Sequence, residues 1–169
     1  RHIPVQLTQL IAVTGWTTDE LSVAIAREKP AHDFDLVTLL IGVNNQYRGR
    51  SVEEYYWQFY SLLCQANLFA KSDPAHVVVV SIPDWGQTPF NTEKDPQLVS
   101  AEIDVYNEIN RSLCEQMQNH YVDITTTGRP LTQRSEYLAP DQLHYSALEY
   151  ARWAKAILPL LIPVFKPAE

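Results

Sequence analysis

The chain has 169 residues, of which 46% are hydrophobic and 20% are charged, so it can bury one substantial core but is short for two. Its net charge of -7 argues against a nucleic-acid binder, since such proteins usually gather Lys and Arg on one face. No apolar run approaches the roughly 20 residues that cross a bilayer. We therefore expect one domain over residues 1–169 without a membrane span, and leave compartment and oligomeric state open.

Strand-like and helix-like segments alternate along the chain. The expected strands are short, apolar and rich in β-branched residues: Leu10 to Val13, Asp35 to Gly42, His76 to Ile82 and His120 to Ile124. The expected helices carry apolar residues at three- and four-residue steps: Thr17 to about Arg27, Ser51 to Ala70, Ser100 to Met117, and Ser146 to about Leu161. This alternation predicts a parallel sheet between two layers of helices.

Three of these helices begin with a Ser or Thr followed three residues later by Glu, the spacing of a capping box. The pairs are Thr17 with Glu20, Ser51 with Glu54, and Ser146 with Glu149. The Pro-rich segment Ser81 to Pro96 is expected to be a long surface loop. Cys64 and Cys114 lack metal-ligand spacing and are expected to be buried free thiols.

Polar residues and glycines follow the expected strands, and in a parallel sheet ligands gather at that edge. Gly15 follows the first strand, Asn44 and Asn45 follow the second, and Pro83 to Gly86 follow the third. Asp141 and His144 stand three residues apart before the last helix. Taken alone, Gly15, Asn44 and Asn45 are better explained as ordinary turn residues, and Asp141 and His144 are also open to a structural explanation.

Taken together, the residues suit acyl transfer. Asp141 can accept the Nδ1 proton of His144, which leaves Nε2 free to act as a base. The Gly15 N–H and the Asn44 side-chain amide can both donate to a developing oxyanion. Asparagine suits this place because its NH₂ is a neutral donor on a short side chain. Trp85 and Phe90, close to the third strand exit, are candidate walls of a substrate pocket, with core packing as the alternative.

With these residues the chain resembles the SGNH hydrolases, also called GDSL-type esterases and lipases. The resemblance rests on three blocks in family order: "VTGWTTDEL" with Gly15, "IGVNNQYRG" with Asn44, and "PDQLHYS" with Asp141 and His144. "SIPDWGQTPF" is similar to the segment that the family carries after its next strand. The resemblance implies a flavodoxin-like three-layer α/β/α fold and a serine esterase that needs no metal or organic cofactor. It also implies that His144 is the base, Asp141 its orienting partner, and Gly15 and Asn44 the oxyanion donors.

Two positions depart from the family pattern. The residue after the asparagine is usually aspartate, whereas here it is Asn45, at a supporting position where we expect a substrate contact. The family nucleophile lies in a Gly-Asp-Ser block at the end of the first strand, and no Gly-Asp-Ser occurs in this sequence. Ser81, Ser51 and Ser146 are poor substitutes, because the first precedes the "IPDW" strand exit and the others cap helices.

We therefore hypothesise that residues are missing before Arg1, with a second gap between Leu7 and Leu10 as a further option, and that they include the first strand and the nucleophile. A sheet lacking an interior strand would expose two unpaired edges. Two alternatives remain open. One is a catalytically inactive SGNH-like module that binds a ligand, and the other is a flavodoxin-like binding or signalling domain, although no flavin phosphate loop or phosphoacceptor acidic cluster follows the strands. The expected partner of the enzyme is a small-molecule ester.

Overall fold

The computed structural model describes residues 6–165 and contains a parallel sheet of three strands in the order β1-β2-β3. Val37 of β1 pairs with Val77 of β2, and Val78 of β2 pairs with His120 of β3. β2 therefore lies between two neighbours, while β1 and β3 each have one edge without a strand among the described residues. The mixed α/β architecture with a parallel sheet, predicted from the alternating pattern, is confirmed.

The strands are β1 (Val37–Leu39), β2 (Val77–Val80) and β3 (His120–Val122). The α-helices are α1 (Thr18–Glu28), α2 (Val43–Tyr47), α3 (Val52–Phe69), α4 (Pro96–Met117), α5 (Thr125–Gly128) and α6 (Ala147–Val164). Short 3₁₀ turns are η1 (Pro74–His76), η2 (Trp85–Gln87), η3 (Arg129–Leu131) and η4 (Ser135–Tyr137). The expected helices are confirmed within a few residues at their ends, as are three of the four expected strands.

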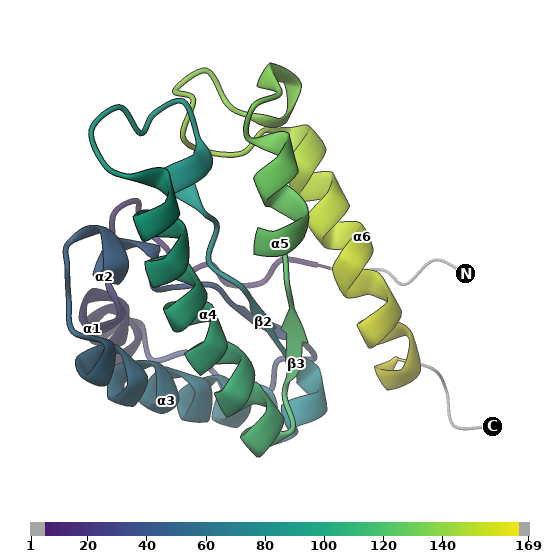
Figure 1. Ribbon diagram of the computed structural model, residues 1–169. Helices are drawn as coiled ribbons and strands as arrows, with labels where there is room; N and C mark the ends of the chain where they lie inside the picture. The colour runs from purple at the N-terminus through teal and green to yellow at the C-terminus, as the bar shows by residue number, and fades with distance from the viewer. Residues whose placement is uncertain (1–5, 166–169) are drawn as a thin grey trace.

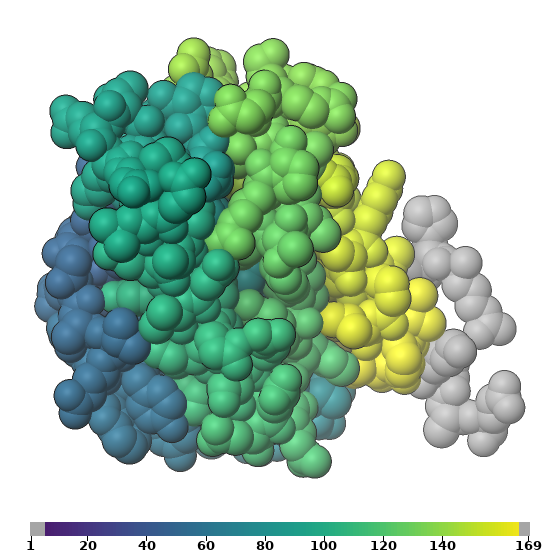
Figure 2. All heavy atoms as spheres, viewed as in Figure 1, coloured from purple at the N-terminus to yellow at the C-terminus, as the bar shows by residue number. Residues whose placement is uncertain are grey.

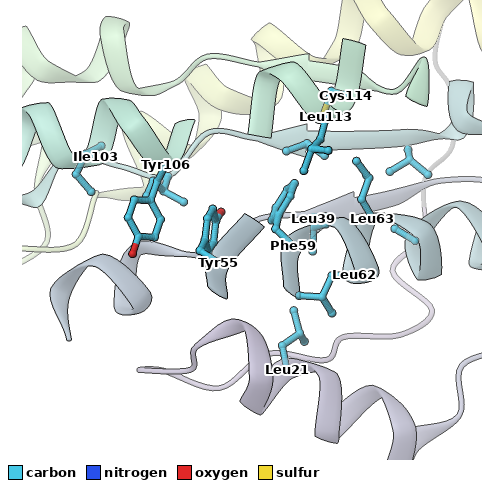
Figure 3. Close-up of a cluster of buried hydrophobic side chains, with 14 of the residues drawn as sticks. Leu21, Leu39, Tyr55, Phe59, Leu62, Leu63, Ile103, Tyr106, Leu113 and Cys114 are labelled. Atoms are coloured by element: carbon cyan, nitrogen blue, oxygen red, sulfur yellow. The ribbon is translucent and has the colours of Figure 1, made fainter. Parts of the chain in front are cut away.

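The central strand β2 consists of four buried valines whose side chains alternate between two cores. Val77 and Val79 face the larger core, which Figure 3 shows between α1, α3 and α4, with Phe59 and Leu63 of α3 among its fully buried members. Val78 and Val80 face the smaller core, where Trp153 and other residues of α6 cover the opposite side of the sheet. Burial on both faces explains why this strand is a continuous apolar run.

These two cores give the molecule three layers. In Figure 1, α1, α3 and α4 lie on one side of the strands and α6 lies on the other. Figure 2 shows the same view with all atoms, in which the teal and green segments of α4 and α5 hide the sheet and α6 forms the yellow flank. Along residues 6–165, no helix combines the length and the apolar character that a bilayer crossing requires.

The expected strand from Leu10 to Val13 is not formed. Residues 6–13 have no regular secondary structure, and the side chains of Leu10 and Val13 are 73% and 59% exposed. A strand needs a neighbour whose backbone groups can satisfy its own, and this segment pairs with none of the three strands. Thr38 of β1 and Leu40 directly after it are exposed.

The three expected capping boxes have different outcomes. The Thr17 N–H donates to the Glu20 carboxylate at 2.8 Å, as predicted. At α3, the Ser51 hydroxyl accepts from the Glu54 N–H at 3.1 Å, but the Glu54 carboxylate binds Arg50 and Gln58 instead of returning to Ser51.

The Ser146–Glu149 capping box predicted at α6 is wrong. The Ser146 hydroxyl donates to the Glu136 carbonyl at 2.7 Å, and Glu149 is fully buried. The Glu149 carboxylate accepts from the indole N–H of Trp153 at 3.1 Å and pairs with Arg152 at 2.9 Å. Tertiary contacts thus provide both side chains with partners other than the local backbone.

The segment from Ser81 to Pro96 is only partly the surface loop that we expected. Its first half is buried, with Asp84 fully enclosed and Trp85 in contact with the larger core. The Asp84 carboxylate accepts from the Gly86 N–H, the Ser100 hydroxyl and the Arg129 guanidinium at 2.6 to 2.9 Å. Only the second half, from Pro89, lies at the surface. Both cysteines are free thiols, with Cys114 buried and Cys64 half-buried.

Candidate active site

Asp141 and His144 form a hydrogen-bonded pair in the loop that precedes α6. Aspartate oxygen Oδ2 lies 2.6 Å from Nδ1 of the imidazole, and the other oxygen accepts the N–H groups of Leu143 and His144, each at 3.0 Å. These three donors, the imidazole first, lower the pKa of Asp141 to about 2. The ionised carboxylate can only accept, so Nδ1 carries the proton, and Nε2 of the neutral ring has a free lone pair.

The backbone around this pair is well anchored. Ala139 donates to the His144 carbonyl at 2.8 Å, and Leu138 and Tyr145 form an isolated antiparallel bridge. Tyr145, directly after the histidine, is buried against Trp153 of α6. The histidine itself stays accessible, with 56% of its side chain exposed, and Nε2 has no hydrogen-bond partner among residues 6–165. A fixed backbone and an open Nε2 are the properties that a general base requires.

Gly15 and Asn44, which lie 29 residues apart in the chain, are brought together at the start of α1. Gly15 has a φ of +89° in a turn closed by the Trp16 N–H and the Val13 carbonyl at 3.3 Å. The Asn44 side-chain NH₂ donates to the Trp16 carbonyl at 3.1 Å. An amide NH₂ carries two hydrogens, so one remains for a further acceptor.

Arg48 is a contact residue that the sequence reasoning missed. Its guanidinium donates to the Gly15 carbonyl at 2.6 Å and to Glu20 at 3.3 Å, so it ties the Gly15 turn to α2 and to the first turn of α1. Arg48 stands four residues after Asn44, and residues at this spacing share one face of a helix. That spacing is the signal in the sequence that could have identified Arg48.

Asn45 does not occupy the place expected of a substrate contact. Its side chain is fully buried, its oxygen accepts from the Thr18 N–H at 3.1 Å, and its NH₂ donates to the Thr18 hydroxyl at 2.7 Å. Both ends of the amide therefore join α2 to the start of α1. This burial does not support a substrate contact, and it explains why an uncharged amide fits here.

Trp85 and Phe90, expected as pocket walls, differ in exposure. Trp85 is 5% exposed, and its indole N–H donates to the Gln46 side chain at 2.7 Å. Phe90 is 43% exposed, and its backbone N–H donates to the Gln142 carbonyl at 3.3 Å. This bond links the loop after β2 to the loop of the Asp141–His144 pair, and Figure 1 shows these two loops next to each other beyond the same end of the strands.

The hydroxyl groups of the three serines considered as nucleophiles all form hydrogen bonds with other residues. Ser81 is fully buried, with its hydroxyl 2.6 Å from that of Thr125 and accepting the N–H groups of Ile124 and Thr125. The Ser51 hydroxyl accepts the Glu54 N–H at the start of α3, and the Ser146 hydroxyl donates to the Glu136 carbonyl. Within residues 6–165, no group of three or more His, Cys, Asp or Glu side chains is placed to hold a metal ion.

The site thus contains the Asp141–His144 pair and, at the start of α1, the Gly15 turn with the Asn44 amide. Comparison with known proteins identifies the family. The model of the GDSL-like lipase/acylhydrolase family matches residues 1–152. The chain belongs to this family. Membership places it among ester-hydrolysing enzymes. A comparison with curated protein sequences finds no match.

Several solved structures share the fold of this chain. A lipase/acylhydrolase from Enterococcus faecalis has a TM-score of 0.64 and 18% identity, over 92% of this chain and 75% of that one. LAE5, a hydrolase from the metagenome of Lake Arreo, has a TM-score of 0.63 and 21% identity, over 90% and 71% of the two chains. The acetylxylan esterase Axe2 from Geobacillus stearothermophilus has a TM-score of 0.63 and 19% identity, over 90% and 69%. The flavodoxin-like arrangement of the GDSL family, expected from the three sequence blocks, is confirmed.

Proposed function

We propose that this GDSL family member cleaves carboxylic esters through an acyl-enzyme, with His144 as general base and Asp141 orienting it. The observation that carries the proposal is the 2.6 Å contact between Asp141 and Nδ1, which leaves Nε2 of an exposed imidazole free to take a proton. A serine hydroxyl attacks the ester carbonyl as Nε2 removes its proton. The same nitrogen then protonates the leaving alcohol, and water repeats the sequence to release the acid.

The oxyanion donors in this proposal are the Gly15 N–H and the free hydrogen of the Asn44 amide. The support is their common attachment to the Gly15–Trp16 turn, where the Trp16 carbonyl holds the first hydrogen of Asn44 and Arg48 holds the Gly15 carbonyl. Donors fixed before the reaction stabilise developing charge without reorganisation, which is where oxyanion holes gain their effect.

The nucleophilic serine in this proposal belongs to a further strand that pairs with the free edge of β1. That edge has no strand partner among residues 6–165, and the exposed Leu40 beside it would gain cover from such a strand. A strand parallel to β1 would end close to α2 and Asn44, because the carboxyl ends of parallel strands meet at one edge of a sheet.

The test is fluorophosphonate labelling of the intact protein, followed by mass spectrometry of the labelled peptide. We expect one labelled serine, loss of labelling and of short aryl-ester turnover in His144→Ala, and little change in thermal stability. As a control, His32→Ala alters an exposed histidine beside Phe69 and should retain both activities. An unlabelled parent protein that still binds esters would instead support the inactive ligand-binding module.

A further inference from the structure

Three aromatic side chains form a row that begins on α2, the helix that carries Asn44, and ends in the loop after β2. Tyr47 of α2, Trp85 of η2 and Phe90 of the following loop make up this aromatic row. The rings of Tyr47 and Trp85 are 5.0 Å apart and those of Trp85 and Phe90 are 6.5 Å apart, both edge to face. Such geometry is favourable for aromatic pairs.

Each end of the row is joined to a different part of the proposed machinery. Tyr47 stands three residues after Asn44, so both lie on one face of α2. At the other end, the Phe90 N–H binds the carbonyl of Gln142, the residue that follows Asp141. The row therefore links α2, which carries Asn44, to the loop of the Asp141–His144 pair.

The centre of the row is rigid and its ends are exposed. Trp85 is held by its hydrogen bond to Gln46, and the next residue, Gly86, lies so close to Val99 that an added Cβ would approach it to 2.6 Å. Tyr47 and Phe90 pack against the Trp85 ring, with 48% and 43% of their surfaces exposed. Exposed aromatic surface supported in this way can contact a ligand without prior rearrangement.

A single ammonium group supplies polar donors beside the rings. The Lys94 Nζ lies 5.4 Å from the ring centres of both Tyr47 and Trp85, within cation–π distance. Its backbone is fixed by Asn91, whose side chain bonds the Lys94 carbonyl at 2.9 Å and the Lys94 N–H at 3.0 Å. The row thus combines aromatic faces with charged N–H donors that lie over two of its rings.

We propose that the aromatic row and Lys94 form a subsite for the alcohol part of the ester, and that this alcohol is a hydroxylated six-membered ring of the pyranoside type. The C–H bonds of such a ring make a flat apolar face for Tyr47 and Phe90, while its hydroxyl groups accept from the Lys94 ammonium. A fatty acyl chain gains most from an enclosed groove, whereas these faces are open. A cationic alcohol such as choline would meet the like charge of Lys94.

The subsite rests on the proposed function, because it assigns the alcohol half of that reaction. The test compares two acetate esters of uncharged polyols on the intact protein: methyl 6-O-acetyl-glucopyranoside, which keeps three free ring hydroxyls, and glyceryl triacetate. We expect Tyr47→Ala and Phe90→Ala each to lower kcat/KM for the pyranoside about tenfold, mainly through KM, with glyceryl triacetate changed less than twofold. Tyr47→Phe, which keeps the ring, should resemble the parent. Lys94→Met should lower the same pyranoside selectivity.

The matched control is Trp57→Ala, which removes an exposed aromatic side chain from α3 and should alter neither ester. Equal losses for both esters in Tyr47→Ala and Phe90→Ala would overturn the subsite. So would a larger loss for p-nitrophenyl octanoate, which would make the row an acyl-chain surface, or improved choline acetate turnover as the main effect of Lys94→Met.

A binding measurement separates this proposal from the hydrolase proposal. Methyl glucopyranoside, which has no ester, is titrated into the His144→Ala protein while the ring resonances of Tyr47 and Phe90 are followed by NMR. Shifts of both rings, absent in Lys94→Met, support the subsite even where the parent turns over no ester. Turnover of both acetates by the parent without any ring shift would remove the subsite and leave the hydrolase proposal standing.

Discussion

Replacing Gly42 with alanine should destabilise the fold strongly, because this glycine lies at a close approach between two elements of the larger core. Gly42 is the residue before α2 and has a φ of +127° and a ψ of -21°, a conformation that side chains rarely allow. An added Cβ would lie 2.5 Å from the Tyr55 hydroxyl and 2.7 to 2.8 Å from two ring carbons. Tyr55 is fully buried, with its hydroxyl 2.8 Å from Asn110, so its ring has little freedom to move.

Two effects add in this variant. Backbone strain at such a φ costs about 1–3 kcal/mol, and overpacking of a buried ring costs roughly another 1–3 kcal/mol. The free energy of unfolding should therefore fall by about 2–6 kcal/mol, a large part of the roughly 5–15 kcal/mol that a domain has. Because Gly42 directly precedes the helix that carries Asn44, any folded fraction should also lose esterase turnover.

The matched control is Gly49→Ala. Gly49 also has a positive φ, of +66°, but an added Cβ would have nothing within 4 Å, so only a left-handed backbone cost of about 1–2 kcal/mol applies. The assay is urea unfolding of both variants followed by circular dichroism, with the midpoints compared at equal m-values. If Gly42→Ala is as stable as Gly49→Ala, the close packing of Tyr55 on this backbone is wrong.

Three further predictions concern the candidate site. Asn44→Ala should lower kcat by about 10²- to 10³-fold through loss of an oxyanion donor, and parental kcat would remove Asn44 from the mechanism. A lysine at position 48 cannot bind the Gly15 carbonyl and Glu20 at the same time, so Arg48→Lys should lower kcat by about tenfold with KM little changed. The control, Arg27→Lys on the outside of α1, should match the parent. Equal kinetics of the two variants would contradict this role of Arg48. Hydrogen bonds from the His144 ring and from the His144 and Leu143 N–H groups lower the pKa of Asp141 from 3.8 to about 2. The stability that they contribute is therefore complete above about pH 4 and is lost as the pH falls through 2, which NMR titration of the carboxyl carbon would show; a midpoint near 4 would contradict the contact with His144.

The sequence predicted well those features that depend on local pattern. β2 was recognisable because four consecutive β-branched residues suit a strand covered on both faces, and both faces are indeed covered. The Asp141–His144 contact was recognisable because three residues of loop are enough for a carboxylate to turn back onto an imidazole. In both cases the informative pattern lies within four consecutive residues.

Features that depend on distant partners were missed or misassigned. Leu10 to Val13 has the composition of a strand, but its backbone pairs with none of the three strands, so composition alone does not decide whether a strand forms. Asn45 carries the same amide as Asn44, yet one residue of helix turns it from the Trp16 carbonyl toward Thr18 in the interior.

By itself, the sequence determined the alternation of strands and helices, the family blocks and the residue types of the candidate site. These features depend on hydrophobic periodicity and on hydrogen bonds between residues that are close together in the chain. Only the tertiary structure decided which of two adjacent asparagines faces the Gly15 turn, that Arg48 holds this turn, and that Tyr47, Trp85 and Phe90 meet in one row. Those contacts join residues separated by up to about 40 positions, and their geometry is set by how helices pack on a sheet, which no local pattern specifies.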